Sequence, residues 1–314
     1  MKTKKLLLSL LTTWVVVTGL SAKNTIVTFR SNKEITVRVN KPIDGVYNFY
    51  YNTDRMDLKP NISIGYELDI HDCCSIRCEL SSGLFFYVLL QEGDHLEISN
   101  MGNQIIFKGD NAAGNQYLFE NYCMKGLGEY FPKVDSIFKK NISNKVDYNA
   151  ISKTFHQYIV PSYTKDIEAL QKEKKITSAF ASDMLQNLYF AYSSIYFYHY
   201  QKLYSGKFIN YKPSVLDSTQ IVNEIDRLYS LTQWKVNPLK CYYASMENYY
   251  SFKYRSLDQM SKNKLLAGHD KETFGEYAGY LLAPDTLQSA LFGSLLISNL
   301  QNKETYFDQE LMLK

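Results

Sequence analysis

The residues best suited to covalent chemistry are three clustered cysteines, Cys73, Cys74 and Cys78. Catalysis of thiol–disulfide exchange needs an attacking thiolate and a second thiol close enough to release the mixed disulfide. The adjacent pair Cys73 and Cys74 closes a disulfide only through a strained ring. On a strand, Cys74 and Cys78 would face the same way, about 13 Å apart at roughly 3.3 Å per residue, and a disulfide tolerates Cα separations of only about 4.4–6.8 Å. Only a sharp turn at 75–76 would bring these redox candidates together, so we expect no reductase activity.

The same segment offers other metal-ligand types, because His71 and Asp72 precede the thiols. A tetrahedral structural zinc site also needs a second group of ligands, such as C-x-x-C or H-x-x-x-H. The sequence contains neither, and we therefore expect no metal site and no bound cofactor. The five cysteines, which include Cys123 and Cys241, are an odd number, so at least one thiol has no partner within the chain.

Familiar catalytic motifs are missing or incomplete. The sequence has no G-x-S-x-G nucleophile motif and no H-E-x-x-H metalloprotease motif. Gly109 and Gly114 have the outer glycine spacing of a P-loop, but Asn115 and Gln116 stand where lysine and serine or threonine belong. We interpret this segment as a strand-to-helix corner. A site assembled from distant serine, histidine and aspartate residues stays open as an alternative.

Tyrosine is abundant, with 27 in the chain. Tyr243, Tyr250 and Tyr254, together with Met246, form a stripe at helical spacing. One hypothesis is a platform on which sugar rings or an aromatic ligand stack, and these three tyrosines are its candidate residues. The other is helix–helix packing, in which each hydroxyl finds a partner at the edge of the core. We favour packing, because a stripe at helical spacing is what packing alone requires.

The first part of the chain alternates with a period near two, which predicts strands. Ile35, Val37 and Val39 are expected on one face of a strand. Further strands are expected at 46–51 and 63–70, and the apolar run 84–90 predicts a strand buried on both faces. Turn signals every 8–12 residues indicate an antiparallel sandwich.

After Gly109 the apolar period changes to about 3.6, which predicts helices. The expected helices span 112–125, ended by Gly126 and Gly128; 148–174, kinked or split at Pro161; and 178–204, begun by Thr177 and stopped at Gly206. Four more are expected, one capped by Asp217 or Ser218, and the others at about 238–260, 270–282 and 284–302. The predicted fold class is α+β, with a β-rich, sandwich-like domain at 23–110 followed by an all-α domain at 111–314.

Residues 1–22 have the basic, apolar and small-residue order of a cleavable export signal. The apolar stretch is shorter than the roughly 18 residues of a spanning helix, so we expect no membrane span after cleavage. The whole chain has 35 basic and 32 acidic side chains, and the leader carries three of the lysines. The mature chain is then close to neutral, and its net charge gives no support to a nucleic-acid partner or to an anionic membrane surface. The expected location is the periplasm or outer envelope.

A family resemblance begins in the segment 86–98, Phe-Tyr-Val-Leu-Leu-Gln-Glu-Gly-Asp-His-Leu-Glu-Ile, and continues in Ile105-Ile106-Phe107-Lys108-Gly109 and Asn115-Gln116-Tyr117-Leu118. This pattern resembles the N-terminal, non-catalytic portion of envelope TlpA-like disulfide reductases of the thioredoxin family. The family's W-C-x-x-C motif does not follow, so no catalytic residue carries over. The resemblance implies an envelope protein built from the family's accessory segments, as a truncated member or one without its catalytic module.

The sequence leaves three functional hypotheses. The first is a non-catalytic accessory or interaction protein of the envelope, whose partner is another envelope protein or a small ligand. The second is a glycan- or aromatic-binding protein that uses the tyrosine-rich helices, which a pocket lined by exposed tyrosines would favour. The third is a hydrolase with a dispersed site, which a carboxylate pair or a serine–histidine contact in a cleft would favour.

Overall fold

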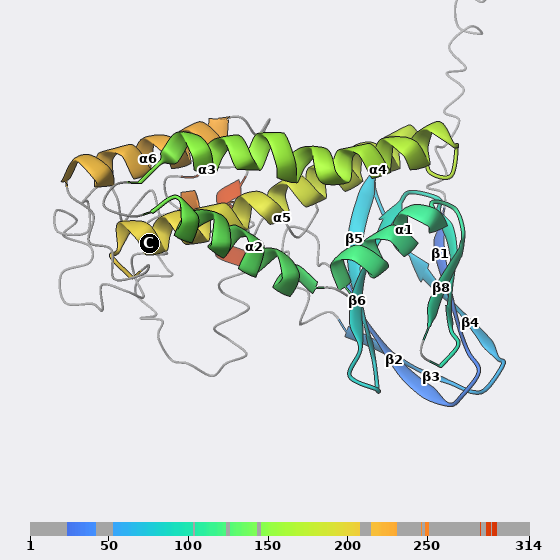
Figure 1. The fold of residues 1–314 in the computed structure, drawn as a ribbon. Coiled ribbons are helices and arrows are strands. Elements are labelled where there is room, and N and C mark those ends of the chain that lie inside the picture. The colour runs from blue at the N-terminus through green and yellow to red at the C-terminus, as the bar shows by residue number, and fades with distance from the viewer. Residues whose placement is uncertain are drawn as a thin grey trace, which may run out of the picture.

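The chain is α+β, with a β-sandwich followed by helices (Figure 1). The computed structural model describes residues 24–41, 53–102, 104–123, 126–142, 146–207 and 215–230, together with 246, 249–250, 283, 287–289 and 291–293. The expected signal peptide and the expected strand at 46–51 lie outside the described residues, as do almost all residues of the last three expected helices.

Two four-stranded sheets face each other across an apolar core. One sheet, in spatial order, contains β4 (Ser63–Leu68), β1 (Thr25–Ser31), β7 (His95–Asn100) and β8 (Ile105–Gly109). The other contains β3 (Thr53–Leu58), β2 (Ile35–Asn40), β5 (Cys73–Leu80) and β6 (Phe85–Gln91). Neighbouring strands are antiparallel except β1 and β7, which are parallel. We expected an antiparallel sandwich, and this expectation is wrong for β1 and β7. Both strands start at the end of the sandwich nearest the helices, so they run in the same direction.

The alternation of apolar residues correctly predicts the inner face of β2. Ile35, Val37 and Val39 are all buried in the sandwich core. The prediction for 84–90 is right only toward the end of β6, where Val88 faces the sandwich core and Leu89 faces the core of the helices. Phe85, at the start of the strand, is 50% exposed, because the helices cover only the other end of this sheet.

The helical part follows the sandwich in the chain and consists of α-helices of different lengths and two π-helical segments. They are α1 (Ala112–Leu118), η1 (Phe119–Cys123), α2 (Gly126–Lys140), α3 (Tyr148–Thr154), η2 (Phe155–Ile159), α4 (Val160–Lys172), α5 (Ser178–Tyr204) and α6 (Val215–Ser230). The two η elements are π-helical turns. Among these elements, no helix is long and apolar enough to cross a bilayer.

Several predicted helix boundaries are confirmed. The Thr177 hydroxyl accepts a hydrogen bond from the Phe180 backbone N–H and caps α5, and Gly206 follows the helix in a left-handed conformation. Pro161 does split its helix. It lies in the first turn of α4, directly after the π-turn η2, where a missing N–H costs least.

Two predicted boundaries are wrong. Gly126 begins α2 instead of ending the previous helix. Asp217 and Ser218 lie within α6, which already starts at Val215. In both cases the residue type is common at a helix end, but it lies in the first turn of the observed helix, where an acidic residue such as Asp217 is also favourable.

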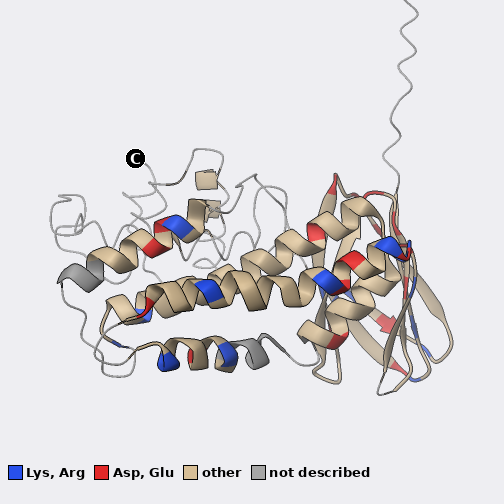
Figure 2. Cartoon of the chain, turned by 45° about the horizontal axis from the view of Figure 1, so that its top comes forward, with Lys and Arg blue, Asp and Glu red and all other residues tan. Residues whose placement is uncertain are grey.

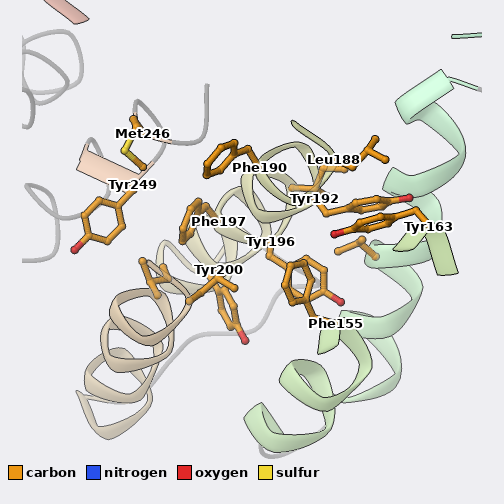
Figure 3. Close-up of a cluster of buried hydrophobic side chains, with 14 of the residues drawn as sticks. Phe155, Tyr163, Leu188, Phe190, Tyr192, Tyr196, Phe197, Tyr200, Met246 and Tyr249 are labelled. Carbon is orange, nitrogen blue, oxygen red and sulfur yellow. The ribbon is translucent and has the colours of Figure 1, made fainter. Parts of the chain in front are cut away.

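The core of the helical part is rich in aromatic side chains from α5 (Figure 3). Tyr192 stacks on Tyr163 of α4 at a centroid separation of 5.5 Å, and Tyr196 meets Phe155 of η2 edge-on at 4.7 Å. All four rings are buried. Because α5 is apolar on nearly all sides, it lies at the centre of this layer.

Candidate functional site

The three clustered thiols lie in two different cores. They belong to β5, on which Cys74 and Cys78 point into the sandwich core and Cys73 points into the helical core. All three are buried. The strand continues unbroken through residues 75–76, so the turn that would have brought Cys74 and Cys78 together does not form.

The surroundings of two of these thiols oppose reactivity. Burial raises the pKa of the Cys74 thiol to about 12. The pKa of Cys73 is also raised, first by burial and then by the nearby Asp183 carboxylate, which the thiol contacts by a hydrogen bond. A reactive cysteine needs a lowered pKa and access to solvent, and these positions have the opposite properties.

The tyrosine stripe falls only partly within the described residues. Tyr250 is 5% exposed, and its hydroxyl lies 2.8 Å from that of Tyr229 on α6. The neighbouring Tyr249 stacks on Tyr229 with centroids 3.8 Å apart. Tyr243 and Tyr254 lie outside the described residues. The surroundings of Tyr250 agree with the packing hypothesis for the stripe.

The strand-to-helix corner connects the sandwich to the helices through α1. The Asn115 side chain accepts a hydrogen bond from the Leu89 N–H and donates one to the Leu89 carbonyl, both at 2.9 Å. The Gln116 side chain accepts from the Phe107 N–H and donates to the Ile105 carbonyl, both at 3.2 Å. β6 and β8 are edge strands of opposite sheets. The two side-chain amides therefore occupy backbone groups on the free edges of β6 and β8, to which another strand could otherwise pair.

Glycines allow this corner to pack closely. Gly109 has a φ of 102°, and a Cβ there would lie 2.2 Å from the His95 carbonyl oxygen. At Gly114, a Cβ would lie 2.4 Å from Cε1 of Phe180 and 2.9 Å from Sδ of Met184. The P-loop spacing of these glycines therefore reflects backbone conformation and helix packing.

A polar network, built around the buried Asn111 and Asp94, fixes the corner to the neighbouring turns. The Asn111 side chain donates to Asp94 at 3.0 Å and accepts from the Thr177 N–H at 2.9 Å. Asp94 also accepts from the Gln91 N–H at 2.9 Å. The Thr177 hydroxyl contacts the Gln91 side chain at 2.9 Å. Three segments far apart in the sequence are thus fixed relative to each other.

These three segments line a groove of about 970 Å³. We call it the junction groove. Its walls are the β6–β7 turn (91–94), the corner before α1 (109–111) and the end of α4 with the α4–α5 turn (168–178). The volume is at the upper end of the range of small-ligand sites. Among the described residues no tyrosine lines the groove, so this lining does not resemble the stacking platform of the second hypothesis.

Both signs of charge occur where the helices meet the sandwich (Figure 2). Within the described residues, Lys175 pairs with Glu173 at 2.7 Å, while Lys172 and Lys174 of the groove have no ion-pair partner. Lys174 has a φ of 57°. It occupies the position after the helix end at which glycine is favoured, with the Lys174 and Lys175 N–H groups bonded to Gln171 and Leu170. A lysine therefore stands in the groove at a position where glycine would be less strained.

The groove also contains carboxylates, which bear on the hydrolase hypothesis. Burial raises the pKa of Asp94, the direction expected of a general acid. However, one oxygen of Asp94 accepts from the Gln91 N–H and the other from Asn111. Asp110 accepts from the His95 N–H at 2.9 Å. These bonds hold the two aspartates in structural roles and leave Glu92 and Glu168 as the other groove carboxylates.

Other candidate chemistry is not assembled in the described part of the chain. No group of three or more histidine, cysteine, aspartate or glutamate side chains could hold a metal there. His71 and Asp72 of the zinc hypothesis therefore do not form such a cluster with the thiols. Ser152 lies one turn before His156, but its hydroxyl is contacted by the Arg227 guanidinium instead.

Comparison with known proteins does not assign the chain. No family model matches it, and no match is found among the curated proteins. Asn115 and Gln116 drew notice in the sequence for what they lack relative to a P-loop and as part of the resemblance pattern, and their role at the strand edges was missed. The signal that could have indicated this role is a pair of adjacent amides in the helix that follows the last strand.

Proposed function

We propose that the protein is an exported accessory protein of the cell envelope that binds a partner protein at the junction groove and has no catalytic activity of its own. The proposal rests on one observation. The groove is assembled from turns that belong to both layers, and a hydrogen-bond network of Asn111, Asp94, Thr177 and Gln91, in which Asn111 and Asp94 are buried, fixes those turns in place. Pre-organisation of this kind lowers the entropy lost on binding.

The chemistry of the groove supports binding over catalysis. Its lining is hydrogen-bonding and charged, with Lys172 and Lys174, which form no ion pair with any described residue, on one wall and Glu92 on the other. The described residues that line it include no cysteine, histidine or tyrosine. Such a surface suits a polar protein segment that carries both signs of charge, since complementary charge gives specificity.

The resemblance to TlpA-like proteins supports an accessory role. The quoted motif residues Asp94 and Asn115 hold the sandwich against α1, while Gly109 allows the close approach to His95 at the corner that leads into α1. In this interpretation the motif preserves an architecture and carries no redox chemistry. Export by the leader at 1–22 and residence in the periplasm or outer envelope are part of the proposal.

A crosslinking experiment in producing cells tests the proposal. A photoreactive residue is placed at Glu92 or Lys172, on opposite walls of the groove, and at the exposed Lys153 of α3 as a control. We expect the same adduct from both groove positions in the envelope fraction, and none from the control. An adduct that forms equally at Lys153, or no adduct from either groove position, would contradict binding at this site.

A further inference from the structure

The end of the sandwich opposite the helices consists of turns. The connections from β1 to β2, β3 to β4, β5 to β6 and β7 to β8 all lie there. Backbone hydrogen bonds join them, from Asn61 to Ser31 at 2.7 Å, from Asn32 to Asn100 at 3.2 Å and from Ser81 to Thr36 at 2.9 Å. We call this surface the turn end. Figure 1 shows it directed away from the helical layer.

Exposed apolar side chains gather at the turn end. Four large apolar side chains are exposed in the described part of the chain. Three of them lie at this end: Ile62 at 54% exposure, Phe85 at 50% and Met101 at 39%. The fourth, Tyr158, is on η2 in the helical part. The opposite end of the sandwich is covered by α1. The exposed apolar side chains of the sandwich are therefore confined to one of its two ends.

The charged side chains in the described residues of these four turns are two lysines and one glutamate. Lys33 and Lys59 are exposed, and neither forms an ion pair within the described residues. Glu34 is the only carboxylate in the described residues of these four turns. Phe85 is itself covered on one side by the Arg77 guanidinium, whose carbon lies 4.7 Å from the ring centroid. Exposed apolar side chains with lysines beside them suit the surface of an anionic bilayer. Its headgroups are negatively charged, and its acyl chains lie just below them.

We propose that the turn end docks onto an anionic lipid surface, with Ile62, Phe85 and Met101 entering the interface and Lys33 and Lys59 meeting the headgroups. The three apolar side chains come from separate turns or strand starts, with polar turn residues between them. A protein interface concentrates its binding energy in one contiguous, fully desolvated cluster, which this arrangement does not supply. Lipid rearranges around each inserted side chain, so separated residues contribute together. This orientation leaves the junction groove on the side away from the membrane, open to a partner.

Vesicle sedimentation tests the proposal on the chain from Ala22 onward, so that the apolar leader cannot contribute. The probes are vesicles of phosphatidylglycerol with phosphatidylcholine, and of phosphatidylcholine alone. We expect binding to the anionic vesicles that weakens with added salt. The triple variant Ile62→Ser, Phe85→Ser, Met101→Ser should bind at least about tenfold more weakly, since it removes the inserted surface. The variant Lys33→Glu, Lys59→Glu should lose most of the preference for anionic vesicles.

Tyr158→Ser is the matched control, because it removes a more exposed aromatic ring at the other end of the molecule. It should bind like the unchanged chain. Melting curves check that each variant is folded, and Ile62→Ser alone replaces the triple variant if the latter is not. Absence of binding to anionic vesicles, or binding that the turn-end variants retain in full, overturns the proposal. The crosslinking result at Glu92 and Lys172 is independent of this outcome, because the two surfaces lie at opposite ends of the sandwich.

Discussion

Asn115 and Gln116 are adjacent in α1, yet their side-chain amides hydrogen bond to the edge strands of opposite sheets. Asn115 bonds both backbone groups of Leu89 on β6, and Gln116 bonds Phe107 and Ile105 on β8. Because consecutive residues on a helix point in different directions, one turn of helix reaches both sheets. α1 thereby closes the open side of the sandwich.

The two amides should differ in energetic importance. Asn115 is fully buried, so Asn115→Ala leaves the Leu89 N–H and carbonyl without partners, and we expect a loss of about 2–4 kcal/mol in the free energy of unfolding. Water can replace part of what Gln116 provides, so Gln116→Ala should cost about 1 kcal/mol. Urea denaturation of both variants measures the difference. Equal losses of unfolding free energy in the two variants would show that burial does not determine how much each amide contributes to stability.

Gly114→Ala tests the close packing of α1 on α5. Alanine favours a helix over glycine by about 1 kcal/mol, but the added Cβ would overlap Phe180 and Met184. Overpacking typically costs about 1–3 kcal/mol, so we expect net destabilisation. Gly65→Ala is the control, since nothing lies within 4 Å of a Cβ there. A double variant with Phe180→Leu should recover part of the loss, and a stabilised Gly114→Ala protein would contradict the packing.

Lys174→Gly should stabilise the protein and weaken partner binding. Lysine at a φ of 57° carries a strain of about 1 kcal/mol that glycine relieves, although the greater freedom of glycine in the unfolded chain offsets part of the gain. Lys172→Gly, within α4, should instead destabilise by up to about 1 kcal/mol. Thermal melting gives the stabilities, and crosslinking from Glu92 reports binding. Unchanged crosslinking in both variants would show that neither lysine contributes to partner binding at the junction groove.

The thiols of β5 should be inert in the folded protein. In a Cys123→Ser, Cys241→Ser background, only the three buried thiols remain. With a pKa near 12 instead of 9, the Cys74 thiolate is roughly a thousandfold scarcer at pH 8. Alkylation by iodoacetamide should therefore be slow until urea unfolds the chain. An insulin-reduction assay should show no turnover above the dithiothreitol background, and activity that Cys74→Ser abolishes would contradict the non-catalytic proposal.

Local patterns predicted the parts of the fold that depend on local physics. The alternation of Ile35, Val37 and Val39 places them in the core because side chains on a strand alternate, and Thr177 begins α5 because its hydroxyl satisfies the Phe180 N–H. β3 was not predicted, because this edge strand is largely charged and turns only Met56 and Leu58 toward the core. The parallel pairing of β1 with β7 joins strands about 70 residues apart, and no local pattern carries that information.

The candidate site was harder to predict for the same reason. The junction groove depends on Asn111 meeting both Asp94 and Thr177. Each residue alone is typical of a turn or a cap, and only the packing of α1 between the layers brings them together. The clustered cysteines and the tyrosine stripe attracted attention by residue type, and the candidates whose side chains are described, which are Cys73, Cys74, Cys78 and Tyr250, are buried. Residue type indicates which chemistry is possible, but burial determines whether it is accessible.

The last prediction concerns the pH dependence of stability at His199. The ring is buried on α5, its Nδ1 donates to the Ile195 carbonyl at 2.8 Å, and it packs on Phe138. Burial lowers the pKa of His199, although Asp135, 3.6 Å from Nε2, partly opposes the shift. The folded pKa therefore lies below the unfolded value of about 6.5. Its contribution to stability is present above that pH, and it is lost as the pH falls through the folded pKa, because the unfolded chain binds the proton more tightly.

His199→Phe keeps a ring on Phe138 and removes the titration. Urea midpoints measured from pH 8 to pH 5 should fall more steeply for the unchanged chain than for this variant. His156, whose pKa is also lowered by burial, titrates in both proteins, so the difference between the two curves isolates His199. Parallel curves would mean that His199 binds its proton equally well in the folded and unfolded chains, which would contradict its burial as a neutral ring.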